Sequence, residues 1–276
     1  YALLLITLPI RFFGVPIGQA SLPFLSEQSE DNERDTFRKL LTQSLNQIAF
    51  LAMPSSILIV ILRVPLVRIL FGTANFPWDA TLSTAKMVGI IAVSITAQAM
   101  VQLLIRAFFA LKDTWTPLLI GLLDLVIFLV AVFAINYFFP ASALEGIAWA
   151  MSIAAFIELF MMVWLLHRRI GAFLSPSLLI SQAKITLASF LMAVFLYLAF
   201  SIFDMTVFNT TRVLELTVFI ITTGTIGLLV YIYFARLLQI RELELVQKIF
   251  SSFSRSRSAI TQTPEVVSQP PESQTL

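Results

Sequence analysis

The sequence predicts an all-α, polytopic membrane protein with about seven transmembrane helices. Hydrophobic residues make up 58% of the 276 residues and charged residues only 12%, against roughly 25% charged residues in an ordinary soluble domain. The apolar residues gather in long runs, as a hydrocarbon solvent requires. Because so few polar residues could not cover a soluble surface, we expect most of the chain to lie in lipid.

Seven apolar runs are long enough to cross about 30 Å of hydrocarbon. They cover residues 1–25, 41–71, 86–111, 116–139, 143–166, 179–203 and 212–238. The connection between the first two runs is too charged to enter lipid, and the glycine and proline of residues 71–79 end the second run. Thr116 followed by Pro117 predicts an N-cap and the first turn of the fourth helix.

Lysine and arginine are distributed unevenly between the two sides of the predicted helices. One side receives 13 of the 18, namely Arg34, Arg38, Lys39, Arg106, Lys112, Arg168, Arg169, Lys184, Arg236, Arg241, Lys248, Arg255 and Arg257. The other side receives only Arg63, Arg68, Lys86 and Arg212. The positive-inside rule makes the first side cytoplasmic, so we expect a cytoplasmic C-terminus. The chain starts with Tyr1 inside an apolar run, which indicates a fragment whose upstream sequence is missing.

Several classes of function are not supported by the sequence. There are no cysteines for disulfides or thiolate metal sites, and no basic stripe that would indicate a nucleic-acid partner. Phosphate-binding glycine loops, H-E-x-x-H and G-x-S-x-G are absent from the sequence. We therefore expect neither an enzyme nor a cofactor or metal site.

Polar residues inside the apolar runs are the candidate functional residues. In the third run Ser94, Gln98, Gln102 and Arg106 recur every four residues, which places them on one face of a single helix. Such a face is costly in lipid, so it is expected to line a hydrated cavity. The alternative is interhelical hydrogen bonding, with Arg106 reaching the cytoplasmic surface.

Three further ionisable residues lie deep in the predicted helices. Arg11 is near the middle of the first run, where its guanidinium could bind the oxygens of a pyrophosphate or pair with a buried carboxylate. Asp124 and Glu158 lie in the fourth and fifth runs. Each could bind a coupling ion, carry a proton or pair with an arginine, and we expect at least one of them to be paired. Gly14 and Gly18 predict close approach of another helix to the first.

Three ordered stretches together resemble the MurJ/MviN family, whose members are flippases for the peptidoglycan precursor lipid II. They are L-P-I-R-F-F-G-V-P-I-G-Q-A-S-L-P-F-L-S-E (8–27), P-L-V-R-I-L-F-G-T-A-N-F (65–76) and R-A-F-F-A-L-K-D-T-W-T-P (106–117). The resemblance extends from Tyr1 to about residue 170, and the last two helices match only in placement. One departure is Leu4, which stands where many members carry an arginine; Arg11, about two turns later, is a candidate to replace it.

The resemblance implies the C-terminal half of a protein with fourteen helices. Residues 1–170 would be the last five helices of the second six-helix lobe, 171–240 two additional helices bordering a groove for the polyprenyl tail, and 241–276 a disordered cytoplasmic tail. The implied mechanism is alternating access around a cationic cavity in the bacterial cytoplasmic membrane, with lipid II, membrane lipids and the cell-wall synthesis machinery as partners. Membrane potential, sodium and protons all remain possible energy sources.

The sequence leaves three other functions open. A transporter of the same superfamily could carry a different polysaccharide-linked lipid or a small cationic drug, but a drug exporter should have an acidic cavity. An integral-membrane transferase would need an acidic catalytic loop in the missing half. A non-transporting scaffold of cell-wall assembly would need no hydrated interior, which the polar face of the third run argues against.

Overall fold

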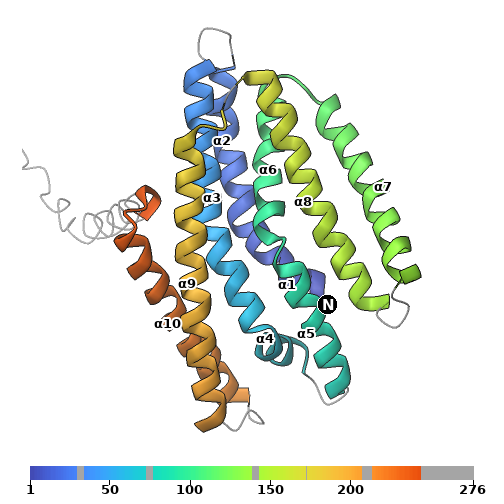
Figure 1. Cartoon of the computed structure of the whole chain (residues 1–276), viewed down its shortest axis with the longest axis vertical. Coiled ribbons are helices and arrows are strands. Elements are labelled where there is room, and N and C mark those ends of the chain that lie inside the picture. The colour runs from blue at the N-terminus through green and yellow to red at the C-terminus, as the bar shows by residue number, and fades with distance from the viewer. Residues whose placement is uncertain (30–33, 73–76, 139–142, 172, 207–212, 244–276) are drawn as a thin grey trace, which may run out of the picture.

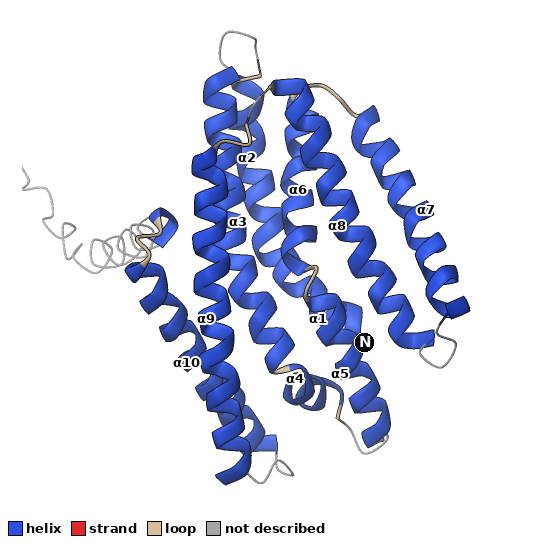
Figure 2. Cartoon of the chain, viewed as in Figure 1, coloured by secondary structure: helices blue, strands red, loops and turns tan. Residues whose placement is uncertain are grey.

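A computed structural model describes residues 1–29, 34–72, 77–138, 143–171, 173–206 and 213–243, and all regular elements among them are helices (Figures 1 and 2). In chain order they are α1 (Ala2–Pro9), η1 (Ile10–Gly14), α2 (Val15–Glu27), α3 (Arg34–Ile61), α4 (Arg63–Phe71), α5 (Trp78–Ala92), α6 (Ile95–Ala110), α7 (Trp115–Phe138), α8 (Ala143–Ile170), α9 (Pro176–Thr206) and α10 (Val213–Leu237). The tail predicted at 241–276 lies almost wholly outside the described residues.

The number of predicted transmembrane helices is confirmed. Six stretches of the described chain are long and apolar enough to cross a membrane, and α5 with α6 forms a seventh as a bent pair. These stretches fall on the seven apolar runs of the sequence. The protein is therefore an all-α polytopic membrane protein.

The first span, Ala2–Glu27, is one helix with a local change of winding. At η1 the helix becomes a π-helix, in which the N–H of Val15 donates to the carbonyl of Ile10. Pro9 and Pro16 on either side have no N–H to donate, so the regular hydrogen-bond ladder is interrupted on both sides of this turn. π-turns of this kind are frequent at functional sites.

The second predicted run is wrong at both of its bounds. α3 begins at Arg34 rather than at 41 and ends at Ile61, and α4 is a separate short helix. Pro65 explains the break, because it cannot donate a hydrogen bond to the carbonyl of Ile61 four residues earlier. The guanidinium of Arg63, beside the break, donates to the carbonyl of Val60 at 2.9 Å.

The third predicted run is also not one helix. α5 and α6 meet at an angle of 48° across Val93 and Ser94. Backbone carbonyls released by a break inside a membrane protein must find other donors. Three serines donate to the carbonyls that precede the break: Ser152 to Ile90 at 3.0 Å, Ser94 to Ile91 at 2.7 Å and Ser56 to Ala92 at 2.5 Å.

Two hydrophobic clusters hold the helices together. The larger cluster joins α2, α3, α6 and α8 to α9 and α10, and the smaller joins α1, α4 and α5 to the neighbouring parts of α3, α6 and α8. Two polar contacts fix the last two helices on α3: Gln182 donates to the side chain of Asn46 at 2.9 Å, and the hydroxyl of Tyr231 donates to the carbonyl of Phe50 at 2.8 Å. α7 stands at the edge of the bundle and packs mainly on α8 (Figure 1).

Candidate functional site

Arg11 lies on the π-turn of the first span, with its side chain on an exposed face. It forms no ion pair or hydrogen bond with another of the described residues. η1 packs against α6 and α3, whereas Asp124 and Glu158 lie on α7 and α8. A buried pair between Arg11 and one of these carboxylates is therefore not seen among the described residues.

Two glycines bring the first span unusually close to α6. A Cβ added to Gly14 would lie 2.9 Å from both the Cα and the carbonyl oxygen of Ala99. A Cβ added to Gly18 would lie 3.4 Å from the carbonyl oxygen of Gln102 and 3.5 Å from Cγ of Arg106. The predicted close approach at these glycines is confirmed, and the helix that approaches is the one with the polar face.

The polar face of α6 is shorter than the sequence predicted. Ser94 precedes α6 at the break and is fully buried, where its hydroxyl also accepts a hydrogen bond from the amide of Gln98 at 2.9 Å. Gln102 and Arg106 follow on α6 and are half-buried beside α2. Ser94 thus stabilises the break, and Gln98, Gln102 and Arg106 remain as the polar side chains of one helix next to the first span.

Asp124 and Glu158 lie apart from that surface, on the packed pair α7 and α8. Both residues are half-buried. Oδ1 of Asp124 is buried without a hydrogen-bond partner, and neither carboxylate is paired with a cation among the described residues. The expected pairing with an arginine is thus not seen in this part of the chain. Carboxyl groups inside a pair of membrane helices can hold a proton or a small cation.

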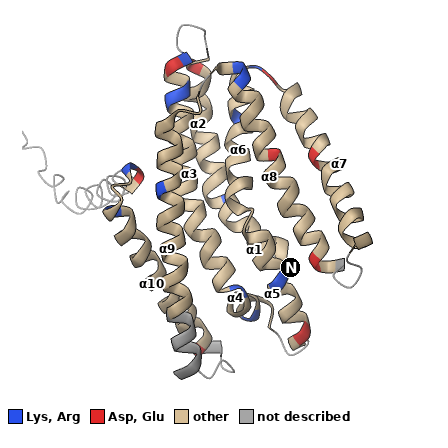
Figure 3. Ribbon diagram, in the orientation of Figure 1, with Lys and Arg blue, Asp and Glu red and all other residues tan. Residues whose placement is uncertain are grey.

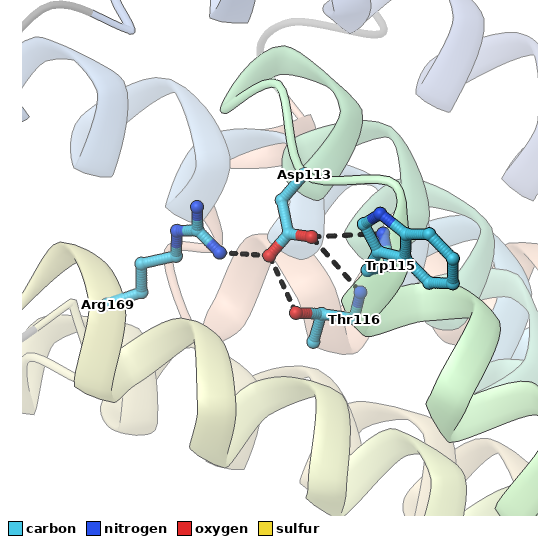
Figure 4. Close-up of polar contacts among 4 residues, drawn as sticks. All are labelled: Asp113, Trp115, Thr116 and Arg169. Carbon is cyan, nitrogen blue, oxygen red and sulfur yellow. Dashed lines mark hydrogen bonds and ion pairs between the residues drawn. The ribbon is translucent and has the colours of Figure 1, made fainter.

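A polar cluster around Asp113, in the connection between α6 and α7, was not among the site residues predicted from the sequence (Figure 4). Oδ1 of Asp113 accepts hydrogen bonds from the backbone N–H groups of Trp115 and Thr116, both at 3.1 Å. Oδ2 accepts a hydrogen bond from the hydroxyl of Thr116 at 2.6 Å and forms an ion pair with Arg169 near the end of α8. Asp113 therefore caps α7, and the prediction of Thr116 as the N-cap is wrong, because Thr116 already lies in the first turn.

The environment of Asp113 also changes its ionisation. Burial alone raises the pKa of this carboxyl, but the hydrogen bonds from Thr116, the charge of Arg169 and the N–H of Trp115 together hold the pKa below its ordinary value of 3.8. The carboxylate is thus ionised at neutral pH. The cap could have been predicted from the sequence, because aspartate is among the residues preferred at an N-cap. Its carboxylate there accepts hydrogen bonds from the backbone N–H groups two and three residues later. Its partner Arg169, 56 residues away, could not be predicted.

A second contact holds the end of α8. Arg38 on α3 donates through Nε to the carbonyl of Ile170 at 2.8 Å, and through Nη2 to the same oxygen. Gly171 follows with φ +79°, the left-handed conformation in which glycine commonly ends a helix. The last turn of α8 is therefore fixed to α3 by Arg38 and to the α6–α7 connection by Arg169.

Comparison with known proteins agrees with this architecture. A family model described as "Lipid II flippase MurJ" matches residues 1–239. A probable lipid II flippase MurJ of Thermotoga maritima is 29% identical over 237 residues, which are 86% of this chain and 44% of that protein. Another from Bdellovibrio bacteriovorus is 27% identical over 179 residues, covering 63% of this chain and 34% of the relative.

A solved structure has the same fold. It is described as "Lipid II flippase MurJ, inward closed conformation", and it superposes with a TM-score of 0.69 at 22% identity, covering 86% of this chain and 45% of the other. The chain thus spans 34% of the Bdellovibrio bacteriovorus relative and 44% of the Thermotoga maritima relative, which is less than half of either protein.

Proposed function

The chain belongs to the MurJ family, and we propose that it forms the C-terminal half of a protein that moves lipid II across the bacterial cytoplasmic membrane by alternating access. The observation that carries the proposal is the match of the family model to residues 1–239, which include all seven spans. In this function the protein moves its cargo without making or breaking a covalent bond. The 22% identical structure supports the fold alone, so the cargo rests on the family.

The surface proposed to face the cargo is formed by the first span and α6. Arg11 supplies an exposed guanidinium without a partner among the described residues, and a guanidinium binds phosphate oxygens through two parallel hydrogen bonds. Gln98, Gln102 and Arg106 continue the polar surface on the helix packed against that span. Because the chain spans less than half of its relatives, a face exposed here can border a cavity shared with the other half.

The same helices contain the irregular turns that a moving transporter needs. The π-turn at Arg11 and the break between α5 and α6 both interrupt regular hydrogen bonding inside the membrane. Short irregular segments absorb the backbone changes of hinge motion. We place ion coupling, in the same proposal, at Asp124 and Glu158, two half-buried carboxyls on the packed pair α7 and α8 that have no cationic partner in the described chain.

Replacing Arg11 by alanine is expected to reduce lipid II transport strongly. The change removes the exposed guanidinium but leaves the packing of Gly14 and Gly18 on α6 intact. The test is complementation with the full-length protein in cells depleted of their own lipid II flippase, with outward exposure of lipid II as the measurement. Each charge-assisted contact contributes about 1.5–3 kcal/mol, so we expect a loss of roughly tenfold or more.

The matched controls are Arg11→Lys and Lys39→Ala. Arg11→Lys keeps the charge and should retain part of the transport, whereas Lys39 is an exposed cation at the start of α3, away from the proposed surface. If the unmutated, correctly inserted protein restores no exposure of lipid II, the lipid II assignment fails. If the protein is active and Arg11→Ala transports normally at equal abundance, only the role of Arg11 fails.

We propose further that one end of the helix bundle, at which α3 begins and α8 ends, lies on the cytoplasmic side of the membrane. Lysine and arginine gather there (Figure 3), and Arg38 on α3 reaches the last carbonyl of α8. α4 and α5, with Arg63, Arg68 and Lys86, lie at the other end. The positive-inside rule then gives the orientation predicted from the sequence, with α10 ending on the cytoplasmic side.

This orientation predicts opposite labelling of two introduced cysteines. Cysteine labelling suits residues 1–276 because they contain no cysteine of their own. Asp79→Cys, at the start of α5, should react with a membrane-impermeant maleimide in intact cells. Lys112→Cys, between α6 and α7, should react only after the cells are permeabilised. The reverse pattern would invert the proposed topology.

A further inference from the structure

An aromatic stripe on α8 ends in an arginine. Phe156, Phe160 and Trp164 follow one another at intervals of four residues, so they lie on one face of the helix. All three are exposed, Phe160 by 70%. One turn further, the guanidinium carbon of Arg168 lies 3.8 Å from the centre of the Trp164 ring. The stripe is therefore apolar along its length and cationic at its end.

A pocket of about 360 Å³ adjoins this end of the stripe. It lies where α6, α7 and α8 meet, and its lining is Phe108, Thr116, Trp164, Leu165, Arg168 and Arg169. Arg169 is engaged with Asp113. Arg168 is exposed and stacks on Trp164, but it has no anionic partner among the described residues. The pocket therefore offers a free guanidinium beside an aromatic wall.

We propose that this pocket binds the headgroup of an anionic glycerophospholipid. The phosphate would lie between Arg168 and Arg169, and one acyl chain along Trp164 and Phe160. A small anion could use the guanidinium groups but not the aromatic stripe, whereas a phospholipid matches both parts at once. Basic pockets between transmembrane helices are known to suit anionic lipid headgroups, and tryptophan favours the headgroup level of a membrane.

The proposed lipid site is distinct from the surface proposed for the cargo. None of its lining residues belongs to the first span or to the polar face of α6. Its ligand is a component of the surrounding membrane. The proposal therefore does not depend on the identity of the transported lipid, and the two can fail separately.

The test is tryptophan quenching in the full-length protein, reconstituted in phosphatidylcholine vesicles with a small fraction of brominated lipid. The signal of Trp164 is obtained as the difference between the protein and its Trp164→Phe variant. Brominated phosphatidylglycerol should quench this signal more effectively than brominated phosphatidylcholine at the same fraction. Because one basic side chain near the membrane surface contributes about 1 kcal/mol, Arg168→Gln should reduce the preference roughly fivefold.

Three comparisons complete the experiment. Arg168→Lys should keep most of the preference, and Lys39→Gln, which removes one exposed cation from α3, should keep all of it. Soluble glycerol phosphate in excess should not restore the emission, because it has no acyl chain. Equal quenching by the two lipids, an unchanged preference in Arg168→Gln, or displacement by glycerol phosphate would each overturn the proposal.

Discussion

Replacing Gly14 by alanine is expected to abolish transport, although the change adds only one methyl group. The new Cβ would lie 2.9 Å from both Cα and the carbonyl oxygen of Ala99. Both are backbone atoms of α6, so no side chain can rotate away, and the π-turn must move off α6. Overpacking of this kind costs about 1–3 kcal/mol, and here it also displaces the turn that carries Arg11.

Gly18→Ala is the matched control on the same helix. Its Cβ would meet the carbonyl oxygen of Gln102 at 3.4 Å and the flexible side chain of Arg106 at 3.5 Å, which are ordinary contact distances. Gly121→Ala on α7 meets nothing within 4 Å and controls for the loss of glycine itself. Both variants should support lipid II exposure and unfold near the temperature of the unmutated protein. If Gly14→Ala behaves as they do, the first span and α6 are not this close in the membrane.

The spans themselves could be predicted from hydropathy, because the membrane imposes a minimum length of apolar sequence on every crossing helix. The breaks within them could not be predicted in the same way. Pro65 could not be identified from the sequence as the cause of the break after α3, because another proline, Pro54, lies inside α3 without ending it. The break at Val93 and Ser94 contains neither proline nor glycine, and it depends on Ser56 and Ser152 from two other helices.

Those parts of the candidate site that lie on a single helix could be predicted from the sequence. The four-residue spacing of Gln98, Gln102 and Arg106 survives on α6, and the glycines of the first span pack where small residues were expected to pack. What the sequence could not provide was the pairing of distant segments. Arg38 reaches the carbonyl of Ile170 across 132 residues, and that contact depends on the arrangement of the whole bundle.

Replacing Asp113 by alanine is expected to lower the stability of the protein by about 2–3 kcal/mol. The change removes the cap of α7, which contributes about 1 kcal/mol, and charge-assisted hydrogen bonds that contribute about 1.5–3 kcal/mol each and are not additive. It also leaves Arg169 without its partner and disconnects α7 from the end of α8. The measurement is the midpoint of thermal unfolding of the full-length protein in detergent, compared between the two forms.

Asp35→Ala is the matched control, because Asp35 also pairs with an arginine, Arg38, at 2.8 Å. Its side chain is 86% exposed, whereas that of Asp113 is 8% exposed. Exposed ion pairs contribute about 0–1 kcal/mol, so Asp35→Ala should change the unfolding midpoint little. Equal effects of the two substitutions on the unfolding midpoint would mean that the buried cap of α7 contributes no more stability than an exposed ion pair.

The effect of Asp113→Ala should also depend on pH in a defined direction. The pKa of Asp113 is lower in the folded protein than its ordinary value of 3.8. A carboxyl with a lowered pKa stabilises the fold fully above the ordinary value, and this contribution is lost as the pH falls through the folded pKa. The difference in unfolding midpoint should therefore stay constant from neutral pH down to about pH 5 and shrink only in stronger acid. A difference that already disappears at neutral pH, or one that persists unchanged in strong acid, would show that the ionised carboxylate is not what fixes α7 to α8.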